Sequence, residues 1–212
     1  FVFKKIYNLQ KKINSRTTDD ASLLINNTNK VKLINGEAKN IKITTKDDIK
    51  ENLRYFFGIG FDVHRLVKNK KLYLGGLKIT SKFGTLGHSD GDPVLHAITD
   101  SILGACRKGD IGQKFSDQDM KFKNIRSTIL LKQVMSQIKM KGYLINNIDI
   151  NIITQTPKIK KYKNKMVESI SKLCRISKNQ INIKGKTTEK LGVIGKEKAI
   201  ACEVITSVIK YD

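Results

Sequence analysis

The spacing of apolar and polar residues changes near Gly58. In residues 1–57 the apolar side chains follow no sustained period. From Gly58 onward, two kinds of segment follow one another: short runs in which apolar and polar residues alternate, and longer segments in which apolar residues recur every three or four positions. Alternation is typical of half-buried strands, and the longer spacing is typical of amphipathic helices. Strands and helices that alternate along the chain predict an α/β fold. We therefore expect residues 58–212 to be one domain, a two-layer sandwich in which helices cover a mixed β-sheet.

The boundaries of the expected elements follow from this pattern and from local signals. Asp92-Pro93 predicts a helix start, because aspartate is a favoured N-cap and proline fits the first helical position. Gly75-Gly76 interrupts one strand and predicts a bulge or a close approach of another backbone. The expected strands are Gly58–His64, Leu72–Ile79, Asn147–Thr154, Gln180–Lys184 and Ala199–Ile209, and the expected helices are 93–106, 124–141 and Lys160–Cys174. The expected loops are 84–92, 108–119 and 186–198.

The chain carries a formal net charge of +22, which favours an anionic partner. Most of this charge is lysine spread along the whole length, and aromatic residues make up 7% of the chain. A nucleic-acid-binding surface would concentrate its basic side chains, so the pattern favours small phosphorylated substrates over nucleic acid. No apolar run approaches the roughly 20 residues of a membrane-spanning helix. We expect no nucleic-acid partner and no membrane partner.

Three cysteines, Cys106, Cys174 and Cys202, lie far apart in apolar stretches without a CxxC spacing. Their odd number and their surroundings predict buried free thiols rather than disulfides or a sulfur-ligated metal. Free thiols are typical of a reducing compartment.

Residues 1–57 hold 12 Lys/Arg against 6 Asp/Glu, with eight asparagines and no proline. Such a segment buries too little apolar surface to offset its ordering entropy, so we expect it to be largely disordered. Basic, polar segments remain from transit peptides or serve as linkers. A transit remnant would place the protein in a plastid-type organelle such as an apicoplast, whereas a linker would leave it cytoplasmic.

Asp62, His64 and His96 form a candidate metal site. Asp62 and His64 are two residues apart on a predicted strand, so both side chains point to one face. His96 lies one turn into the helix that begins at Pro93. One carboxylate and two imidazoles suit zinc, whose tetrahedral shell would keep a fourth position open. Asp100, four residues further on the same helical face, is expected to bind the second ring nitrogen of His96. From spacing alone, a hydrogen-bonded strand pair and an exposed helical aspartate are the commoner alternatives.

Several loops combine small residues with basic or hydroxyl side chains. Gly87, Ser89 and Gly91 let backbone N–H groups approach an anion closely. A single loop of this kind is usually only a turn, but several in one chain predict a phosphate site. The basic and hydroxyl positions are His88-Ser89, Pro157-Lys158 and Lys186-Thr187-Thr188.

Six segments carry a family resemblance: GIGFDVHRL, GHSDGDPVLHAITDSILGA, GDIGQKFSDQD, QTPK, KTTEKLG and GKEKAIACE. In this order, from Gly58 to the C-terminus, they resemble the 2-C-methyl-D-erythritol 2,4-cyclodiphosphate synthases of the non-mevalonate isoprenoid pathway. The resemblance implies a compact α/β unit that assembles as a homotrimer, with active sites between subunits. It implies conversion of 4-diphosphocytidyl-2-C-methyl-D-erythritol 2-phosphate to 2-C-methyl-D-erythritol 2,4-cyclodiphosphate, with release of CMP. Residues 1–57 take no part in it.

The resemblance also implies roles for individual residues. The predicted zinc site matches the family's zinc ligands, and Glu189 matches the ligand of a second ion, Mg²⁺ or Mn²⁺. His88 and Thr187 match residues that stabilise the transition state. The substrate contacts that it implies, besides these residues, are Val63, Ser89, Asp110, Ile111, Gly112, Phe115, Ser116, Asp117, Gln118, Asp119, Thr154, Gln155, Thr156, Pro157, Lys158, Ile159, Lys160, Lys186, Thr188, Val193 and Lys196.

The chain departs from the family pattern at four of these positions, and one of them is Ser116, which stands where proline is common. Lys186 stands where threonine is frequent, and its ammonium is expected to contact a phosphate. Val193 and Lys196 stand near the trimer axis, where phenylalanine and arginine are common. Lysine cannot reproduce the bidentate contact that arginine makes with an isoprenoid diphosphate.

Three alternatives to the synthase remain open at the level of sequence. A nucleic-acid-binding protein would have no need of the metal motifs. A zinc hydrolase using metal-bound water would need a general base, and none is evident. A non-catalytic relative that binds CDP compounds would be expected to have lost a metal ligand.

Overall fold

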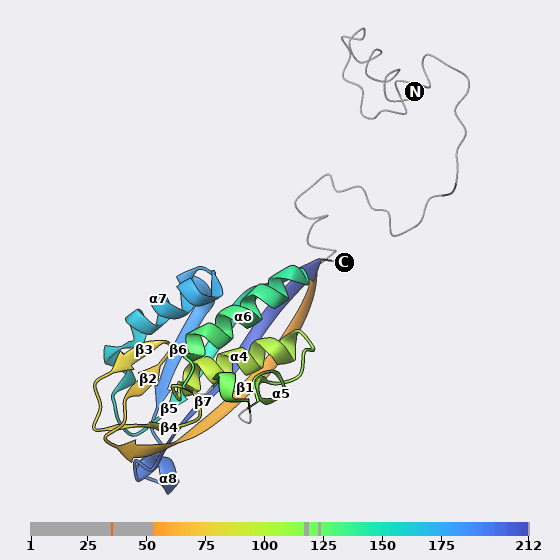
Figure 1. The fold of residues 1–212 in the computed structure, drawn as a ribbon. Helices are drawn as coiled ribbons and strands as arrows, with labels where there is room; N and C mark the ends of the chain where they lie inside the picture. The colour runs from red at the N-terminus through yellow and green to blue at the C-terminus, as the bar shows by residue number, and fades with distance from the viewer. Residues whose placement is uncertain (1–34, 36–52, 117–118, 123, 212) are drawn as a thin grey trace, which may run out of the picture. The chain divides into compact units, whose positions relative to one another are not determined.

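The computed structural model describes residue 35 and residues 53–116, 119–122 and 124–211 (Figure 1). The helices and strands that it describes all lie in the second of two units, residues 49–212. Five strands form one sheet in the order β4-β1-β7-β5-β6, in which β5 and β6 run parallel and the other neighbours antiparallel. β2 and β3 form a separate hairpin. The strands are β1 (Leu53–Lys68), β2 (Leu72–Leu74), β3 (Leu77–Ile79), β4 (Phe83–Leu86), β5 (Tyr143–Ile153), β6 (Ile181–Lys186) and β7 (Ala199–Tyr211).

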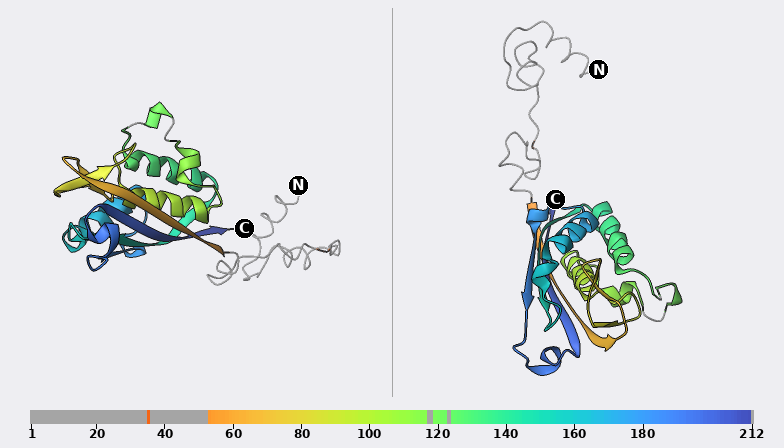
Figure 2. Two further views of the ribbon diagram at one scale, coloured as in Figure 1. Left: turned by 90° about the horizontal axis from the view of Figure 1, so that it is seen from below. Right: turned by 90° about the vertical axis from the view of Figure 1, so that its left-hand side faces the viewer.

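Three helices of at least three turns cover one face of the sheet, as Figure 2 shows edge-on. Side chains such as Ile98 of the helix layer and Ile150 of β5 are fully buried between the two layers. This arrangement confirms the predicted fold class, a mixed sheet covered by helices. Within the described residues, no helix has the length and apolar content needed to cross a membrane. The helices are α4 (Pro93–Ala105), α5 (Ile111–Lys114), α6 (Ser127–Met140), α7 (Lys163–Cys174) and α8 (Gly192–Gly195), with 3₁₀ turns at Met120–Phe122, Ile159–Lys161 and Lys178–Gln180.

Two glycines of β1 allow α4 to lie directly on the strand. A Cβ at Gly60 would come within 2.0 Å of the carbonyl oxygen of Ala97, and one at Gly58 within 2.1 Å of that of Ser101. The Ser101 hydroxyl also lies 2.6 Å from the Thr206 hydroxyl of β7, which fixes the helix over both central strands. The close approach brings the start of α4 against the middle of β1.

The strand predicted at Gly58–His64 begins earlier and ends later, because β1 runs from Leu53 to Lys68. Its first residues therefore belong to the folded unit and not to the predicted leader of residues 1–57. The start was missed because Tyr55, Phe56 and Phe57 are all apolar, so the period of two disappears. The remainder of the predicted leader lies outside the described residues, apart from residue 35.

The single strand predicted over Leu72–Ile79 is wrong, since the structure has a hairpin there. Gly75 and Gly76 adopt φ values of 61° and 84°, which glycine tolerates and which a tight two-residue turn requires. The loop predicted at 84–92 contains part of β4, and the loop at 108–119 contains α5, whose first turn is capped by Asp110.

Candidate metal centre and phosphate pocket

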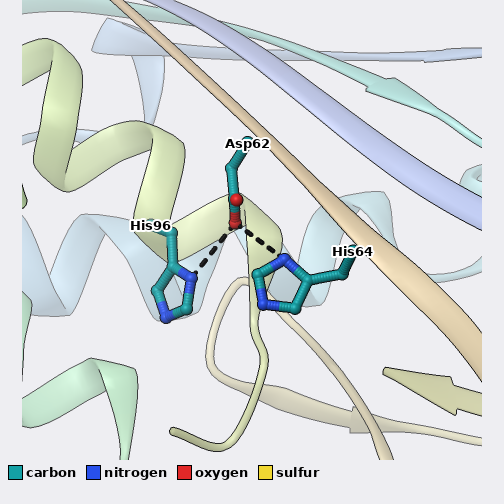
Figure 3. Close-up of side chains that lie close together, drawn as sticks. All are labelled: Asp62, His64 and His96. Carbon is teal, nitrogen blue, oxygen red and sulfur yellow. Dashed lines mark hydrogen bonds and ion pairs between the residues drawn. The ribbon is translucent and has the colours of Figure 1, made fainter. Parts of the chain in front are cut away.

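Asp62, His64 and His96 converge on one point (Figure 3). Asp62 and His64 point from β1 toward the helix layer, and His96 reaches them from the first turn of α4. The Asp62 Oδ2 atom lies 3.1 Å from Nδ1 of His64 and 3.1 Å from Nδ1 of His96. The structure thus brings together the three residues predicted to hold a metal.

The electrostatics of this cluster favour a charged carboxylate. Burial by itself raises the pKa of Asp62, but the close contacts with the imidazoles of His64 and His96 outweigh it and lower the pKa to about 2. Burial by itself lowers the pKa of His96, whereas the hydrogen bond and charge of Asp62 raise it, with a further contribution from Asp92 and Asp90. The net direction for His96 is upward. The cluster therefore offers a charged carboxylate and two imidazoles to a proton or a cation.

The donor set fits a metal ion. One candidate ligand atom from each residue lies within 4.8 Å of the other two, and all three side chains are half-buried. The Nδ1 atom of His64 is buried and makes no aligned hydrogen bond, despite its proximity to Asp62. A buried imidazole lone pair beside a carboxylate suits zinc. It is the only cluster of this kind among the described residues.

The contact predicted between Asp100 and the second ring nitrogen of His96 is not formed. Asp100 Oδ1 instead accepts a hydrogen bond of 3.0 Å from the backbone N–H of Ile111, and so fixes the start of α5. The Nε2 atom of His96 lies 2.8 Å from the hydroxyl of Ser127 and 3.0 Å from that of Ser89. Ser127 was missed because nothing in its local sequence marks it, and only the packing of α6 on α4 places it there.

The loop that joins β4 to α4 is built around Asp92. Its carboxylate is fully buried and accepts hydrogen bonds from the N–H groups of Val94 and Leu95, as the predicted N-cap. It also accepts from Gly75 and Gly76, at 3.0 and 2.6 Å, and so ties the β2–β3 hairpin to the helix start.

This loop passes close to the metal cluster. A Cβ at Gly87 would lie 3.0 Å from His64 Nε2, and Gly91 has a φ of 65° that favours glycine. His88 Nε2 is buried and has no hydrogen-bond partner within the described residues. An unpartnered imidazole nitrogen on this loop is a candidate contact for a bound ligand.

A hollow of about 410 Å³ is lined by several of the residues that the family resemblance implies as substrate contacts. The Thr156–Pro157 peptide bond is cis, and Gly185 leaves room for Ile159, which a Cβ there would approach to 2.8 Å. Lys163 and Lys184 were not predicted, and they add to a strongly cationic wall. The lining residues are Thr154, Pro157, Lys158, Ile159, Lys160, Lys163, Ile183, Lys184, Gly185, Lys186 and Thr187.

Several residues that the resemblance implies as substrate contacts are hydrogen-bonded or ion-paired to other side chains of the chain. The Thr187 hydroxyl donates to Glu189 Oε1 at 2.6 Å, and Glu189 has a φ of 49°. Thr156 donates to Glu197, and Asp119 pairs with Lys121 at 2.6 Å.

The remaining predicted contacts follow no common pattern. Phe115 is buried edge-on against Phe122, with ring centroids 5.3 Å apart. The Gln155 Oε1 atom is buried without a partner among the described residues. Val193 lies in α8 and is exposed, with Lys196 following that helix. Asp117 and Gln118 lie outside the described residues.

Comparison with known proteins places this geometry in a family. The chain is 67% identical over 212 residues to the bifunctional enzyme IspD/IspF of Pelagibacter ubique, covering 100% of this chain and 57% of that relative. It is 52% identical over 153 residues to the 2-C-methyl-D-erythritol 2,4-cyclodiphosphate synthase of Clostridium botulinum strain Eklund 17B, covering 72% of this chain and 98% of that relative. The chain therefore spans little more than half the length of the bifunctional relative.

Solved structures of similar proteins have the same fold as this chain. The bifunctional IspDF of Campylobacter jejuni has a TM-score of 0.73 at 37% identity, covering 96% of this chain and 57% of that one. A CDP complex of IspF from Plasmodium falciparum has a TM-score of 0.66 at 41% identity, covering 74% and 97%. The resemblance found in the sequence motifs is confirmed. Residues 55–209 match the YgbB family, and the chain belongs to that family.

Proposed function

We propose that residues 53–211 form a metal-dependent 2-C-methyl-D-erythritol 2,4-cyclodiphosphate synthase of the non-mevalonate isoprenoid pathway. The substrate is 4-diphosphocytidyl-2-C-methyl-D-erythritol 2-phosphate, and the products are the cyclic diphosphate and CMP. The observation that carries the proposal is the convergence of Asp62, His64 and His96 beside a glycine-containing loop, in a chain that covers 98% of a relative bearing this name.

The chemistry joins two anionic groups within one substrate. An oxygen of the 2-phosphate attacks the β-phosphorus of the diphosphate, and the bond from that phosphorus to the bridging oxygen breaks as CMP leaves. Both groups are negatively charged, so the protein must neutralise and align them. A zinc ion held by Asp62, His64 and His96 would supply positive charge and orientation to the β-phosphate. No side chain acts as a nucleophile in this scheme.

The protein's own side chains supply the rest. We assign the unpartnered His88 Nε2 to a hydrogen bond with a phosphate oxygen, and Thr187, which lines the lysine-rich hollow, to a second one. Lys158, Lys186 and their neighbours there would hold the cytidine phosphates. Charge-assisted contacts of this kind are about twice as strong as neutral hydrogen bonds. We assign Glu189 to Mg²⁺ or Mn²⁺, which prefers a carboxylate with substrate phosphates.

We propose that three copies assemble through the open face of the sheet. Every second residue along β1 presents a large apolar side chain on the face that the helices leave uncovered, with exposed fractions between 52% and 69%. An apolar stripe of this size marks an interface. Val63, at the end of the stripe, lies between Asp62 and His64 in the sequence but points to the opposite face of β1, so the stripe supports an interface, and the closing of the active site by a neighbouring copy rests on the family resemblance. The residues of the stripe are Tyr55, Phe57, Ile59, Phe61 and Val63.

We assign residues 1–52 to a linker region within a bifunctional enzyme. The Pelagibacter relative aligns with the whole chain, whereas the Clostridium synthase aligns with 72% of it. These bacterial relatives favour the linker over the transit remnant, and with it the cytoplasmic alternative over a plastid-type organelle.

The function is tested by incubating the protein with the CDP-linked substrate, zinc and magnesium. Phosphorus NMR should show the cyclic diphosphate appearing in step with CMP. A zinc hydrolase would instead give open-chain phosphates carrying oxygen from water. His96→Ala should abolish turnover, and Lys139→Ala, an exposed change on α6, should not. Absence of the cyclic product with wild-type protein contradicts the proposal.

A further inference from the structure

Behind the metal cluster lies a chain of polar contacts that begins at His96 and ends at Arg126. The His96 Nε2 atom lies 2.8 Å from the hydroxyl of Ser127, and that hydroxyl lies 2.5 Å from Asp90 Oδ1. Asp90 Oδ2 accepts from Arg126 Nε at 2.7 Å, and Asp90 Oδ1 accepts from the backbone N–H of Ser127 at 3.2 Å. Ser127 is 1% exposed, so no bulk water competes for these contacts.

The protons in this chain have one consistent arrangement. A carboxylate that pairs with a guanidinium only accepts hydrogen bonds, so the single hydroxyl proton of Ser127 points to Asp90. The Ser127 oxygen can then only accept from His96, and Nε2 of His96 must carry the proton. The Nδ1 lone pair then points at Asp62 Oδ2, 3.1 Å away, and a proton or a metal ion between these two atoms joins them.

We infer that Ser127 is a positioning residue, an inference that rests on the proposed metal site. Together with Asp90, Ser127 holds His96 in the tautomer that carries its proton on Nε2. The Nδ1 atom of His96 is then the ligand atom. The outer hydrogen bond of a metal-binding histidine fixes its tautomer and ring orientation. In this protein the carboxylate of Asp90 fixes the histidine tautomer through the hydroxyl of Ser127. Asp100, four residues along the helix from His96, makes no such contact.

The chain of contacts is anchored in the fold rather than in the substrate loops. Arg126 Nη2 donates to the carbonyl of Gly76 at 3.2 Å, and its guanidinium lies over the ring of Tyr73 at 4.3 Å. The β2–β3 hairpin therefore holds Arg126, which holds Asp90. The Ser89 hydroxyl also lies 3.0 Å from His96 Nε2 and accepts from the N–H of Gly91 at 3.2 Å, and its second lone pair can share the Nε2 proton with Ser127.

Zinc affinity and the histidine tautomer test the inference directly. In Ser127→Ala, competition with a chelator should show zinc affinity reduced by about 10- to 100-fold, and Ser127→Thr should restore most of it. The matched control is Ser136→Ala, an exposed serine of the same helix, which should bind zinc as the wild type does. Circular dichroism of each variant reports whether it has folded.

Nitrogen-15 NMR of histidine-labelled wild type decides the tautomer without any change at Ser127. The chain has three histidines, so comparison with His96→Ala assigns the signals. Zinc-loaded protein, and metal-free protein at about pH 9, should both carry the His96 proton at Nε2. A proton at Nδ1, or unchanged zinc affinity in folded Ser127→Ala, overturns the inference. If wild type fails to bind zinc or to release CMP, the proposed function fails instead, and the tautomer still decides the role of Ser127.

Discussion

Asp92 shows how one buried side chain can position a site without touching a ligand. Its two oxygens receive four backbone N–H groups, two from the first turn of α4 and two from the β2–β3 turn. Burial raises the pKa of this carboxyl, although the hydrogen bonds from Gly76, Leu95 and Gly75 oppose the rise.

Asp92→Ala would leave these donors unsatisfied and should cost about 2–4 kcal/mol in the free energy of unfolding. Urea unfolding measures this loss. Asp119→Ala, which removes only a surface pair with Lys121, should shift the transition midpoint little, and an equally stable Asp92→Ala would contradict the assignment.

Cys174 gives a pH dependence whose sign can be derived. Cys106, Cys174 and Cys202 are free and buried, which confirms the prediction from sequence. Burial raises the pKa of Cys174 from the ordinary thiol value of 9.0 to about 12. Between those two values the unfolded chain releases the thiol proton and the folded chain keeps it, so folding stability falls as pH rises. The loss per thiol approaches about 1.4 kcal/mol for each pH unit. The free energy of unfolding of the wild type and of Cys174→Ala is measured at pH 8 and at pH 10.5. Lysine titration is common to both proteins, so the difference between their losses is the contribution of the Cys174 thiol. Parallel losses in the two proteins would refute the assignment.

At the scale of elements, prediction from sequence succeeded where the signal was local. Asp62 and His64 share a strand face, and His96 follows a helix start marked by Asp92-Pro93, so two short motifs predicted the whole cluster. Ser127 was missed because its role depends on how α6 packs against α4, which no local pattern records. The start of β1 was missed because Tyr55, Phe56 and Phe57 follow one another without a polar residue between them. The sequence therefore predicted residues that touch the proposed metal, but not those that hold them.

The contact between α4 and β1 can be tested with a pair of glycines. A Cβ at Gly60 would meet the backbone oxygen of Ala97 at 2.0 Å, so Gly60→Ala must push α4 away and move His96. We expect a loss of about 1–3 kcal/mol in the free energy of unfolding, with weaker zinc binding. Gly104→Ala is the matched control. Its Cβ would lie 3.8 Å from its nearest neighbours, and alanine favours the helix. Thermal unfolding and zinc titration compare the two, and a Gly60→Ala protein as stable as Gly104→Ala would be inconsistent with the close approach.

At the scale of the whole molecule, the open face of the sheet should control assembly. Phe57 is 69% exposed on β1 and lies five residues from the nearest metal ligand. In the proposed trimer a carboxylate there would be buried without a partner between subunits, so Phe57→Asp should give monomers of 24.0 kDa and reduce turnover. Zinc content should persist, because the ligands come from one chain. Light scattering gives the mass. Met140→Asp, at an exposed methionine of α6, is the control, and a trimeric Phe57→Asp would show that assembly uses another surface.

The boundary of the catalytic unit follows from the pairing of its first strand. Leu53 to Phe57 pair with Ser207 to Tyr211 of β7, and Phe56 packs edge-on against Tyr143, with ring centroids 5.8 Å apart. A chain that starts at residue 53 keeps these contacts, whereas one that starts at residue 58 exposes an edge of β7 and loses two side chains of the apolar stripe. We therefore expect the first to retain CMP release and the mass of the assembly. The second should melt at lower temperature and dissociate more readily. Equal behaviour of the two truncations would place the boundary at Gly58, as the sequence pattern alone predicted, and loss of activity in both would make residues 1–52 part of the catalytic unit.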